Sequence, residues 1–302
     1  MNKPKVLVLV ATYNGEKYLR TQLDSILNQK DVDIFIKVAD DRSTDSTKEI
    51  FEEYKQKYSN FDYYINEKNK GFTYNFLDLY FSVKDEQFDY CAFSDQDDYW
   101  LDNKVIEAIK KIEENPHPNG TLYCSNLTLV DQDLKPFGMQ EKEKILKAKK
   151  NSFLISNVAT GCTIVVNRRF YDHSTKYYPQ NIHLHDYWLF LIASYTAKSV
   201  YDFNSYIYYR QHQSNQIGSN KAIFTKAKFK EFFHPKHSKD ELPKELLKGF
   251  EKDIFEDDLK YVKMVAFYKD SFKNKNRLLF SNKIRARRLD FIYRLRVLFK
   301  TF

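Results

Sequence analysis

The chain has 302 residues, of which 42% are hydrophobic and 30% charged, a balance typical of globular proteins that excludes a wholly disordered chain. Its formal net charge of +8 is uneven, because residues 221–302 carry 22 basic and 11 acidic side chains, whereas residues 1–220 have a small acidic excess. The three scattered cysteines argue against a disulfide framework or a zinc cluster and favour a reducing cytosol.

The first half of the sequence alternates strand and helix patterns. The apolar run at 5–11 predicts a buried strand and not a signal peptide, because Thr12-Tyr13-Asn14-Gly15-Glu16 follows it instead of a cleavage site of small residues. Further strands are predicted at 34–39, 61–65 and 90–93, with helices at 19–27, 50–58 and 72–81. This alternation predicts an α/β fold with a mostly parallel sheet, helices on both faces, and ligands at the carboxyl ends of the strands.

The second half is less regular. Strands are predicted at 122–126, 162–166 and 206–209, and the Lys- and Glu-rich residues 140–150 predict a surface excursion. Beyond about residue 218 the pattern becomes helical and basic. We therefore expect a catalytic domain at 1–220 and a basic helical extension at 221–302. No apolar run approaches the ~20 residues that span a bilayer.

Acidic side chains follow two of the predicted strands. Asp95, Asp97 and Asp98 come directly after the strand at 90–93, where their mutual repulsion favours a divalent cation such as Mg²⁺ or Mn²⁺. The alternative is an ordinary acidic turn. Asp40 and Asp41 end another strand, where they either cap the next helix or accept hydrogen bonds from a nucleotide base and ribose.

Two later motifs offer catalytic groups. His185-Asp186 precedes an apolar helical run, so Asp186 is either a helix cap or a general base. The segment Tyr209-Arg210-Gln211-His212 follows a predicted strand and offers a metal ligand, although a lone histidine is more often structural.

Taken in this order, the motifs resemble family 2 glycosyltransferases of the GT-A fold. The matching text is Ala11-Thr12-Tyr13-Asn14-Gly15, Asp40-Asp41-Arg42-Ser43, Asn69-Lys70-Gly71 with Asn75, and Asp95-Gln96-Asp97-Asp98. Longer strings resemble a narrower branch of bacterial rhamnosyltransferases that build wall and capsular polysaccharides: Phe93–Leu101, Thr160-Gly161-Cys162-Thr163, His185-Asp186-Tyr187-Trp188-Leu189 and Tyr209–His212. The resemblance covers residues 5–220.

The resemblance implies an inverting enzyme that moves a sugar from a nucleoside-diphosphate donor to a glycan or lipid-linked saccharide acceptor, with Mn²⁺ or Mg²⁺. Asp186 matches the catalytic base, and His185 stands where the wider family has an acidic residue. The implied metal ligands are Asp95, Asp97 and His212. The implied donor-nucleotide residues are Thr12, Tyr13, Asn14, Asp40, Asp41, Asn75 and Asp95. Sugar or acceptor contacts are expected from Trp100, Thr160, Gly161, His185, Trp188 and Arg210.

The narrower resemblance favours dTDP-L-rhamnose as the donor, with a UDP-hexose as the alternative. A sugar nucleotidyltransferase is disfavoured because it would normally hold a triphosphate with a loop rich in glycine and basic residues, whereas residues 11–17 have one glycine and little charge. A pure glycan-binding module is disfavoured by the candidate base Asp186. The Gln-x-x-Arg-Trp motif of processive synthases is absent, which favours transfer of single sugars.

The C-terminal residues show a basic amphipathic pattern. Plotted as a helix, Ile284, Phe291, Leu295 and Leu298 share one face, and residues 271–302 carry ten basic and one acidic side chain. This pattern predicts a helix on an anionic membrane surface, and hence a cytoplasmic enzyme peripheral to the inner membrane face. The alternative is a helix packed on the catalytic domain; nucleic acid is not an expected partner.

Overall fold

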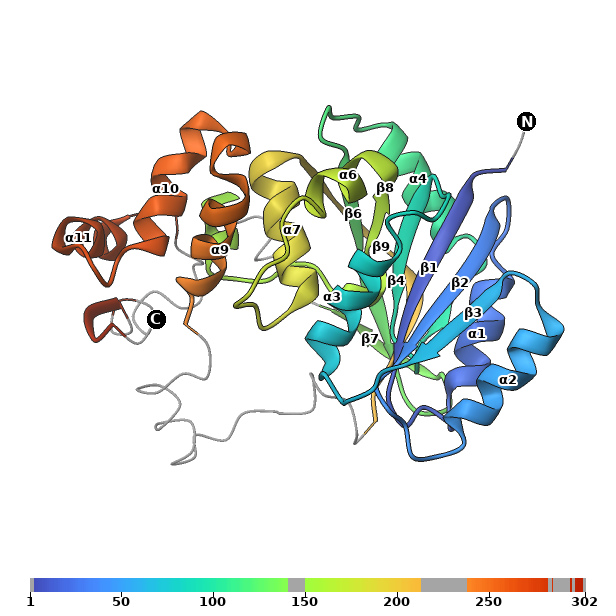
Figure 1. Cartoon of the computed structure of the whole chain (residues 1–302). Helices are drawn as coiled ribbons and strands as arrows, with labels where there is room; N and C mark the ends of the chain where they lie inside the picture. The colour runs from blue at the N-terminus through green and yellow to red at the C-terminus, as the bar shows by residue number, and fades with distance from the viewer. Residues whose placement is uncertain are drawn as a thin grey trace. The chain divides into compact units, whose positions relative to one another are not determined.

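A computed structural model of the chain describes residues 3–140, 150–212 and 238–281, together with 284, 294 and 297–300 (Figure 1). The chain forms two compact units. The first contains residues 1–140, 159–175 and 197–218, and the second contains 141–158, 176–196 and 219–302. The second unit includes two segments that precede residue 220, namely 141–158 and 176–196. A catalytic domain that ends at residue 220 stays a prediction.

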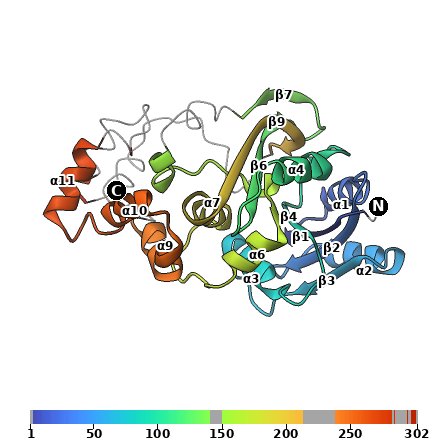
Figure 2. The ribbon, with the colours of Figure 1, turned by 90° about the horizontal axis from the view of Figure 1, so that it is seen from above.

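The first unit is built on a mixed sheet whose four N-terminal strands are parallel. The described strands follow the order β3-β2-β1-β4-β8-β6-β9-β5, with β7 paired to β6 (Figure 2). β1 (Lys5–Thr12), β2 (Asp33–Asp40), β3 (Phe61–Ile65) and β4 (Tyr90–Ser94) are parallel. The others are β5 (Tyr99–Trp100), β6 (Thr121–Val130), β7 (Pro136–Met139), β8 (Val165–Asn167) and β9 (Lys198–Arg210). The predicted α/β class is confirmed.

Alternation along β1 explains why helices cover both faces of the sheet. Val6, Val8 and Val10 pack in one buried cluster with apolar side chains of α1 (Leu19–Leu27), α2 (Thr47–Lys57) and α4 (Lys104–Glu113). The opposite face holds a cluster of aromatic rings, in which Phe93 contacts Phe76 and Tyr80 of α3 (Phe72–Ser82), and Tyr80 contacts Tyr171 of α6 (Arg168–Ser174). Both layers are visible in Figure 2.

The strand register brings the predicted polar clusters to one edge. Thr12 at the end of β1 pairs with Asp40 at the end of β2, and Val10 pairs with Ser94 at the end of β4. Because these strands are parallel, the segments that follow them leave the sheet side by side. This edge carries the pocket described below.

The predicted strand at 162–166 is wrong in its first half. Residues Gly161–Thr163 form a 3-10 turn, and the strand β8 begins only at Val165. The Thr163 hydroxyl and backbone N–H both donate to the Thr160 carbonyl, at 2.7 and 2.9 Å. Because the Thr163 side chain and backbone both bind a carbonyl three residues earlier, these hydrogen bonds favour a turn where the apolar pattern predicted an extended chain.

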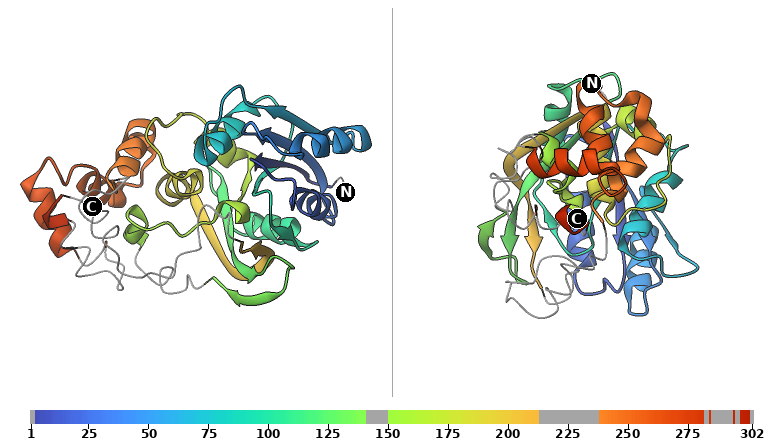
Figure 3. Two further views of the ribbon diagram at one scale, coloured as in Figure 1. Left: turned by 90° about the horizontal axis from the view of Figure 1, so that it is seen from below. Right: turned by 90° about the vertical axis from the view of Figure 1, so that its left-hand side faces the viewer.

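The second unit is helical in its described part. Its helices are α7 (His185–Thr196), α9 (Glu241–Phe250), α10 (Glu256–Ala266) and α11 (Phe272–Phe280), with a 3-10 helix at Lys150–Leu154 (Figure 3). Every residue of α7 is buried, and Trp188 at its centre contacts Tyr177 and Phe250. Among the described residues, no helix is long and apolar enough to cross a membrane. The surface excursion at 141–149 and most of the predicted helix at 284–299 lie outside the described residues.

Gly120 provides a direct test of the packing before β6. Its φ is +81°, and an added Cβ would lie 2.0 Å from the backbone nitrogen of Phe170. We expect Gly120→Ala to lower the free energy of unfolding by ~2 kcal/mol or more, because backbone atoms cannot move aside cheaply. Gly138→Ala is the control, since a Cβ there meets open space. Equal denaturant midpoints for the two variants would contradict the expected clash.

Candidate functional site

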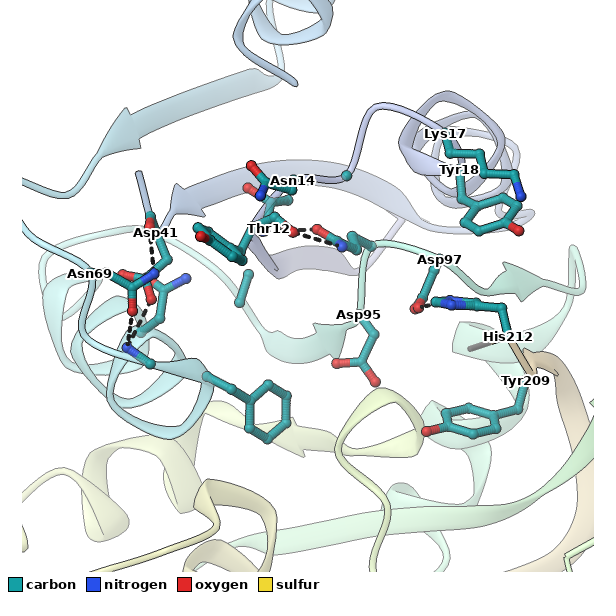
Figure 4. A pocket seen from close by; sticks show the side chains of 17 residues that line it. Thr12, Asn14, Lys17, Tyr18, Asp41, Asn69, Asp95, Asp97, Tyr209 and His212 are labelled. Carbon is teal, nitrogen blue, oxygen red and sulfur yellow. Dashed lines mark hydrogen bonds and ion pairs between the residues drawn. The ribbon is translucent and has the colours of Figure 1, made fainter. Parts of the chain in front are cut away.

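A pocket of about 790 Å³ opens at the carboxyl edge of the sheet, within the size range of small-molecule sites. In Figure 4, Asp41 and Asn69 lie at one end of it, Asp97 and His212 lie at the other, and the Asp95 carboxylate lies between them. Eight residues that the sequence singled out line this pocket: Thr12, Tyr13, Asn14, Asp41, Asn75, Asp95, Asp97 and His212. Segments from five parts of the first unit therefore converge.

The acidic turn after β4 sends its three carboxylates in different directions. Asp95 and Asp97 line the pocket, whereas Asp98 is fully buried. Burial raises the pKa of the Asp98 carboxyl well above its ordinary value, and the nearby Asp97 and Asp95 carboxylates raise it further. The repulsion among the three carboxylates that the sequence predicts is thus reduced, because burial favours the neutral form of Asp98.

Arg210, at the end of β9, holds this turn in place. Its backbone N–H donates to Asp98 Oδ1 at 3.1 Å, and its Nε donates to the Asp97 carbonyl at 2.7 Å. A second guanidinium nitrogen donates to the Gln132 carbonyl, and the guanidinium lies 4.3 Å from the centre of the Tyr18 ring. Arg210 is 3% exposed. It supports the turn from behind and does not form the pocket surface that the sequence suggested for it.

The donor set at this end suits a hard divalent cation. His212 Nε2 lies 2.7 Å from Asp97 Oδ2, and Asp95 lines the same pocket. Two carboxylates and one imidazole are ligands that Mn²⁺ and Mg²⁺ accept. Asp95, Asp98 and Cys162 also form a close group, with potential ligand atoms within 4.8 Å of one another. Burial raises the pKa of both Asp98 and Cys162, which keeps them protonated and makes them poorer ligands than Asp97 and His212.

At the other end, Asp41 organises the loop before α3. Its Oδ1 accepts hydrogen bonds from the Lys70 backbone N–H at 2.8 Å and the Asn66 side chain at 3.0 Å, and its Oδ2 accepts the Gly71 N–H at 2.8 Å. A carboxylate offers about four acceptor positions, so Asp41 retains capacity for one donor from a ligand. Asn75 donates to the Ala39 carbonyl and accepts from Asn66, so two protein groups orient its amide.

The loop after β1 is tied to its neighbours by side chains. Thr12 donates to buried Asp40 at 3.0 Å, and the Thr44 backbone N–H donates to Asn14 Oδ1 at 2.8 Å. The amide of Gln96 pairs with both backbone polar groups of Tyr13, at 2.8 and 3.1 Å. Asp40 does not line the pocket, so the structure gives it a bracing role where the sequence suggested contact with the nucleotide.

The motif His185-Asp186 lies in the second unit, at the start of α7. Asp186 Oδ1 accepts hydrogen bonds from its neighbour's backbone N–H at 2.6 Å and from Asn157 Nδ2 at 3.1 Å. Burial lowers the pKa of His185 to about 3, so this imidazole is neutral. The helix start that the sequence predicted is confirmed, and the carboxylate is oriented by two donors.

Several expected sugar contacts lie away from the pocket lining. Trp100 and Trp188 are fully buried, each in the core of its own unit. Thr160 and Gly161 form part of the 3-10 turn region, and the Thr160 hydroxyl donates to Gln140. Asn69, Gln96 and Tyr209, which stand in the quoted motifs without an assigned role, also line the pocket, and the sequence analysis missed the lining residues Lys17, Tyr18 and Phe72. Only their place beside the recognised motifs could have indicated them.

A buried lysine lies behind the acidic turn. Lys104 is 2% exposed, and its ammonium lies 3.6 Å from the centre of the Trp100 ring. Burial lowers its pKa to about 7, while Cys162 and Asp98 act in the opposite direction. The site therefore contains a cation that titrates near neutral pH directly beneath its carboxylates.

Comparison with protein families gives a match to the profile described as "Glycosyl transferase family 2" over residues 7–202. The chain is 36% identical over 233 residues to the dTDP-rhamnosyl transferase RfbG of Shigella flexneri, which covers 73% of this chain and 77% of that protein. It is 34% identical over 160 residues to the uncharacterized glycosyltransferase MJ1057 of Methanocaldococcus jannaschii, covering 51% and 52%.

Solved structures share the fold at low sequence identity. S. aureus TarS 1–349 in complex with UDP-GlcNAc matches with a TM-score of 0.57 and 19% identity, over 97% of this chain and 90% of that one. The mannosyltransferase PcManGT from Pyrobaculum calidifontis, in complex with GDP-Man and Mn²⁺, matches with a TM-score of 0.53 and 12% identity, over 100% of this chain and 88% of that one.

Lys104→Met tests the buried cation. Below pH ~7 the lysine is protonated in both the folded and the unfolded protein, so the difference in unfolding free energy between variant and wild type should be constant. Between pH 7 and the ordinary lysine pKa of 10.5, only the unfolded protein keeps this proton. Wild-type stability should then rise relative to the variant, by up to about 1.4 kcal/mol per pH unit. Denaturant titrations from pH 6 to 9, with exposed Lys68→Met as the control, measure this; a constant difference throughout would disprove it.

Proposed function

The chain belongs to glycosyl transferase family 2, and from this premise we propose that it is an inverting, metal-dependent rhamnosyltransferase that uses dTDP-L-rhamnose. That it is a glycosyltransferase of the GT-A fold follows from the family match and the structural neighbours. The choice of rhamnose is carried by one observation, the 36% identity to a dTDP-rhamnosyl transferase over 73% of the chain. A UDP-hexose is the second candidate, because uracil and thymine present the same imide edge to Asp41.

The pocket suggests how the donor binds. The base would lie near Asp41 and Asn69, where one acceptor position of the Asp41 carboxylate remains for an imide N–H. The diphosphate would lie at the other end, where Asp95, Asp97 and His212 would hold Mn²⁺ or Mg²⁺. The bound cation would neutralise negative charge that develops on the leaving diphosphate. Lys17, which also lines the pocket, adds a further positive charge on this side.

Asp186 is proposed as the general base. An acceptor hydroxyl has a pKa far above neutral, so its proton must be removed as it attacks the anomeric carbon. In this step the new carbon–oxygen bond forms while the bond to the diphosphate oxygen breaks, and the hydroxyl proton moves to the Asp186 carboxylate. One base on one face gives inversion in a single displacement. The donors from Asn157 and the helix start fix the orientation of this carboxylate.

The acceptor is proposed to be a growing glycan or a lipid-linked saccharide at the inner face of the cell membrane. The name of the Shigella relative specifies its donor and not its acceptor, so the proposed acceptor class rests on the basic character of residues 221–302. This location agrees with a cytoplasmic pool of nucleotide sugars, and no nucleic acid partner is expected.

A donor panel tests the proposal directly. Release of nucleoside diphosphate from dTDP-L-rhamnose, UDP-glucose, UDP-N-acetylglucosamine and GDP-mannose should be strongest with dTDP-L-rhamnose. It should require Mn²⁺ or Mg²⁺ and stop on adding a chelator, because the Asp95 and Asp97 carboxylates otherwise repel the diphosphate. Turnover only with UDP-hexoses would reject rhamnose and retain the enzyme class. Undiminished release in chelator would reject the metal.

Two aspartate variants separate binding from proton transfer. Asp186→Asn keeps the shape of the side chain but cannot accept a proton, so transfer should fall ~100-fold or more while donor affinity is retained. Asp97→Asn should instead weaken metal and donor binding together with turnover. Calorimetric titration with the nucleoside diphosphate, beside rates with an acceptor, distinguishes the two. An Asp186→Asn enzyme with the parental rate would show that Asp186 only caps α7.

A further inference from the structure

Helix α11 presents an unusual exposed face. The helix begins after Ser271, whose side chain accepts the Asn274 backbone N–H at 3.2 Å, and this cap fixes its register. Of its nine residues only Leu278 is buried. Phe272 and Phe280 are 80% and 73% exposed, more than any other large hydrophobic side chain in the described part of the chain.

The exposed aromatic side chains share their face with positive charge. At about 100° per residue, Phe272, Lys273, Arg277 and Phe280 project within an arc of about 140°, opposite Leu278. All four are exposed. The helix contains no acidic residue, and none of the ion pairs found among the described residues involves Lys273 or Arg277. A helix that only needed a solvated outer face would place polar groups at positions 272 and 280.

The neighbouring helix shows that this pattern is particular to α11. α10 begins with Glu256, Asp257 and Asp258 and buries its apolar residues Val262, Met264 and Val265. Its exposed surface is therefore mixed in charge and mostly polar. The α10 surface fits solvent, whereas the aromatic and cationic α11 surface fits an amphiphilic partner.

We propose that the exposed face of α11 docks on an anionic lipid bilayer. Its two phenylalanine rings can insert at the boundary between headgroups and acyl chains, while Lys273 and Arg277 lie at the level of the lipid phosphates. A second copy of the chain is a poorer occupant, because pairing this face with itself would bring like charges together. A nine-residue helix also offers far less than the ~800 Å² per partner of a stable protein interface.

This inference gives the proposed membrane location a surface among the described residues. It is independent of the amphipathic pattern at 284–299. It is tested without donor or acceptor, so an error in the proposed transfer chemistry would leave the result unchanged.

The test is sedimentation of the full-length protein with vesicles of phosphatidylcholine alone or mixed with phosphatidylglycerol. The wild type should bind the anionic vesicles, and binding should weaken with salt. Lys273→Glu/Arg277→Glu should reduce the partition coefficient at least ~10-fold, since each exposed cation near an anionic surface is worth about fivefold. Phe272→Ser/Phe280→Ser should also reduce it at least ~10-fold, because the variant loses both rings that insert into the bilayer. Both double variants should keep the wild-type melting temperature, because all four side chains are exposed.

Matched controls use exposed positions of the same residue types elsewhere. Phe137→Ser removes an exposed aromatic ring from β7, and Lys260→Glu reverses an exposed charge on α10. Both should bind vesicles like the wild type. Unchanged vesicle binding by the two α11 double variants would overturn the proposal. The proposal would also be overturned if the wild type formed a dimer without lipid and Phe272→Ser/Phe280→Ser were a monomer, because this face would then bind a second copy of the chain.

Discussion

Three carboxylates within four residues at the end of β4 are the constraint on which the organisation of the first unit depends. Asp98 is withdrawn into the interior, Asp97 is paired with His212, and Asp95 is left facing the pocket. The groups that stabilise this arrangement come largely from one strand, because β9 delivers both Arg210 and His212 more than a hundred residues later in the chain. The long pairing of β9 with β6 therefore positions residues of the candidate site as well as extending the sheet.

Asp40 and Asp41, at the end of β2, hold neighbouring loops in place through hydrogen bonds. Asp41 receives three hydrogen bonds from its own protein, and Asp40 is buried among Thr12 and Ser43. A carboxylate held by backbone donors has a fixed direction, so any remaining acceptor position is presented to a ligand without a loss of side-chain entropy on binding. The sequence interpretation set capping of the next helix against ligand binding. In the structure Asp41 does not cap α2, because its hydrogen bonds come from Asn66, Lys70 and Gly71 in the loop before α3, and one acceptor position remains for a ligand.

The two units differ in the side chains that they leave exposed. The first unit concentrates its functional groups in a polar pocket at the sheet edge, while the second has a fully buried central helix and, on α11, exposed aromatic and basic side chains. This contrast repeats the charge asymmetry of the sequence, in which the last 82 residues carry the basic excess.

The sequence alone determined the strands and helices of residues 5–94, the edge at which the ligand groups gather, and the family, because hydrophobic periodicity and short motifs are local properties. It also placed the start of α7 correctly at His185. It missed α4 and assigned a strand at 162–166 where Gly161–Thr163 turn, since local hydrogen bonds there outweigh the apolar pattern. Only the tertiary structure decided that Arg210 supports the acidic turn from behind, that Asp98 and Trp100 are buried, and that the Lys104 ammonium lies against the Trp100 ring. Those roles depend on which side chains meet across distant segments and how deeply they are buried, and neither property is encoded in the spacing of residues along the chain.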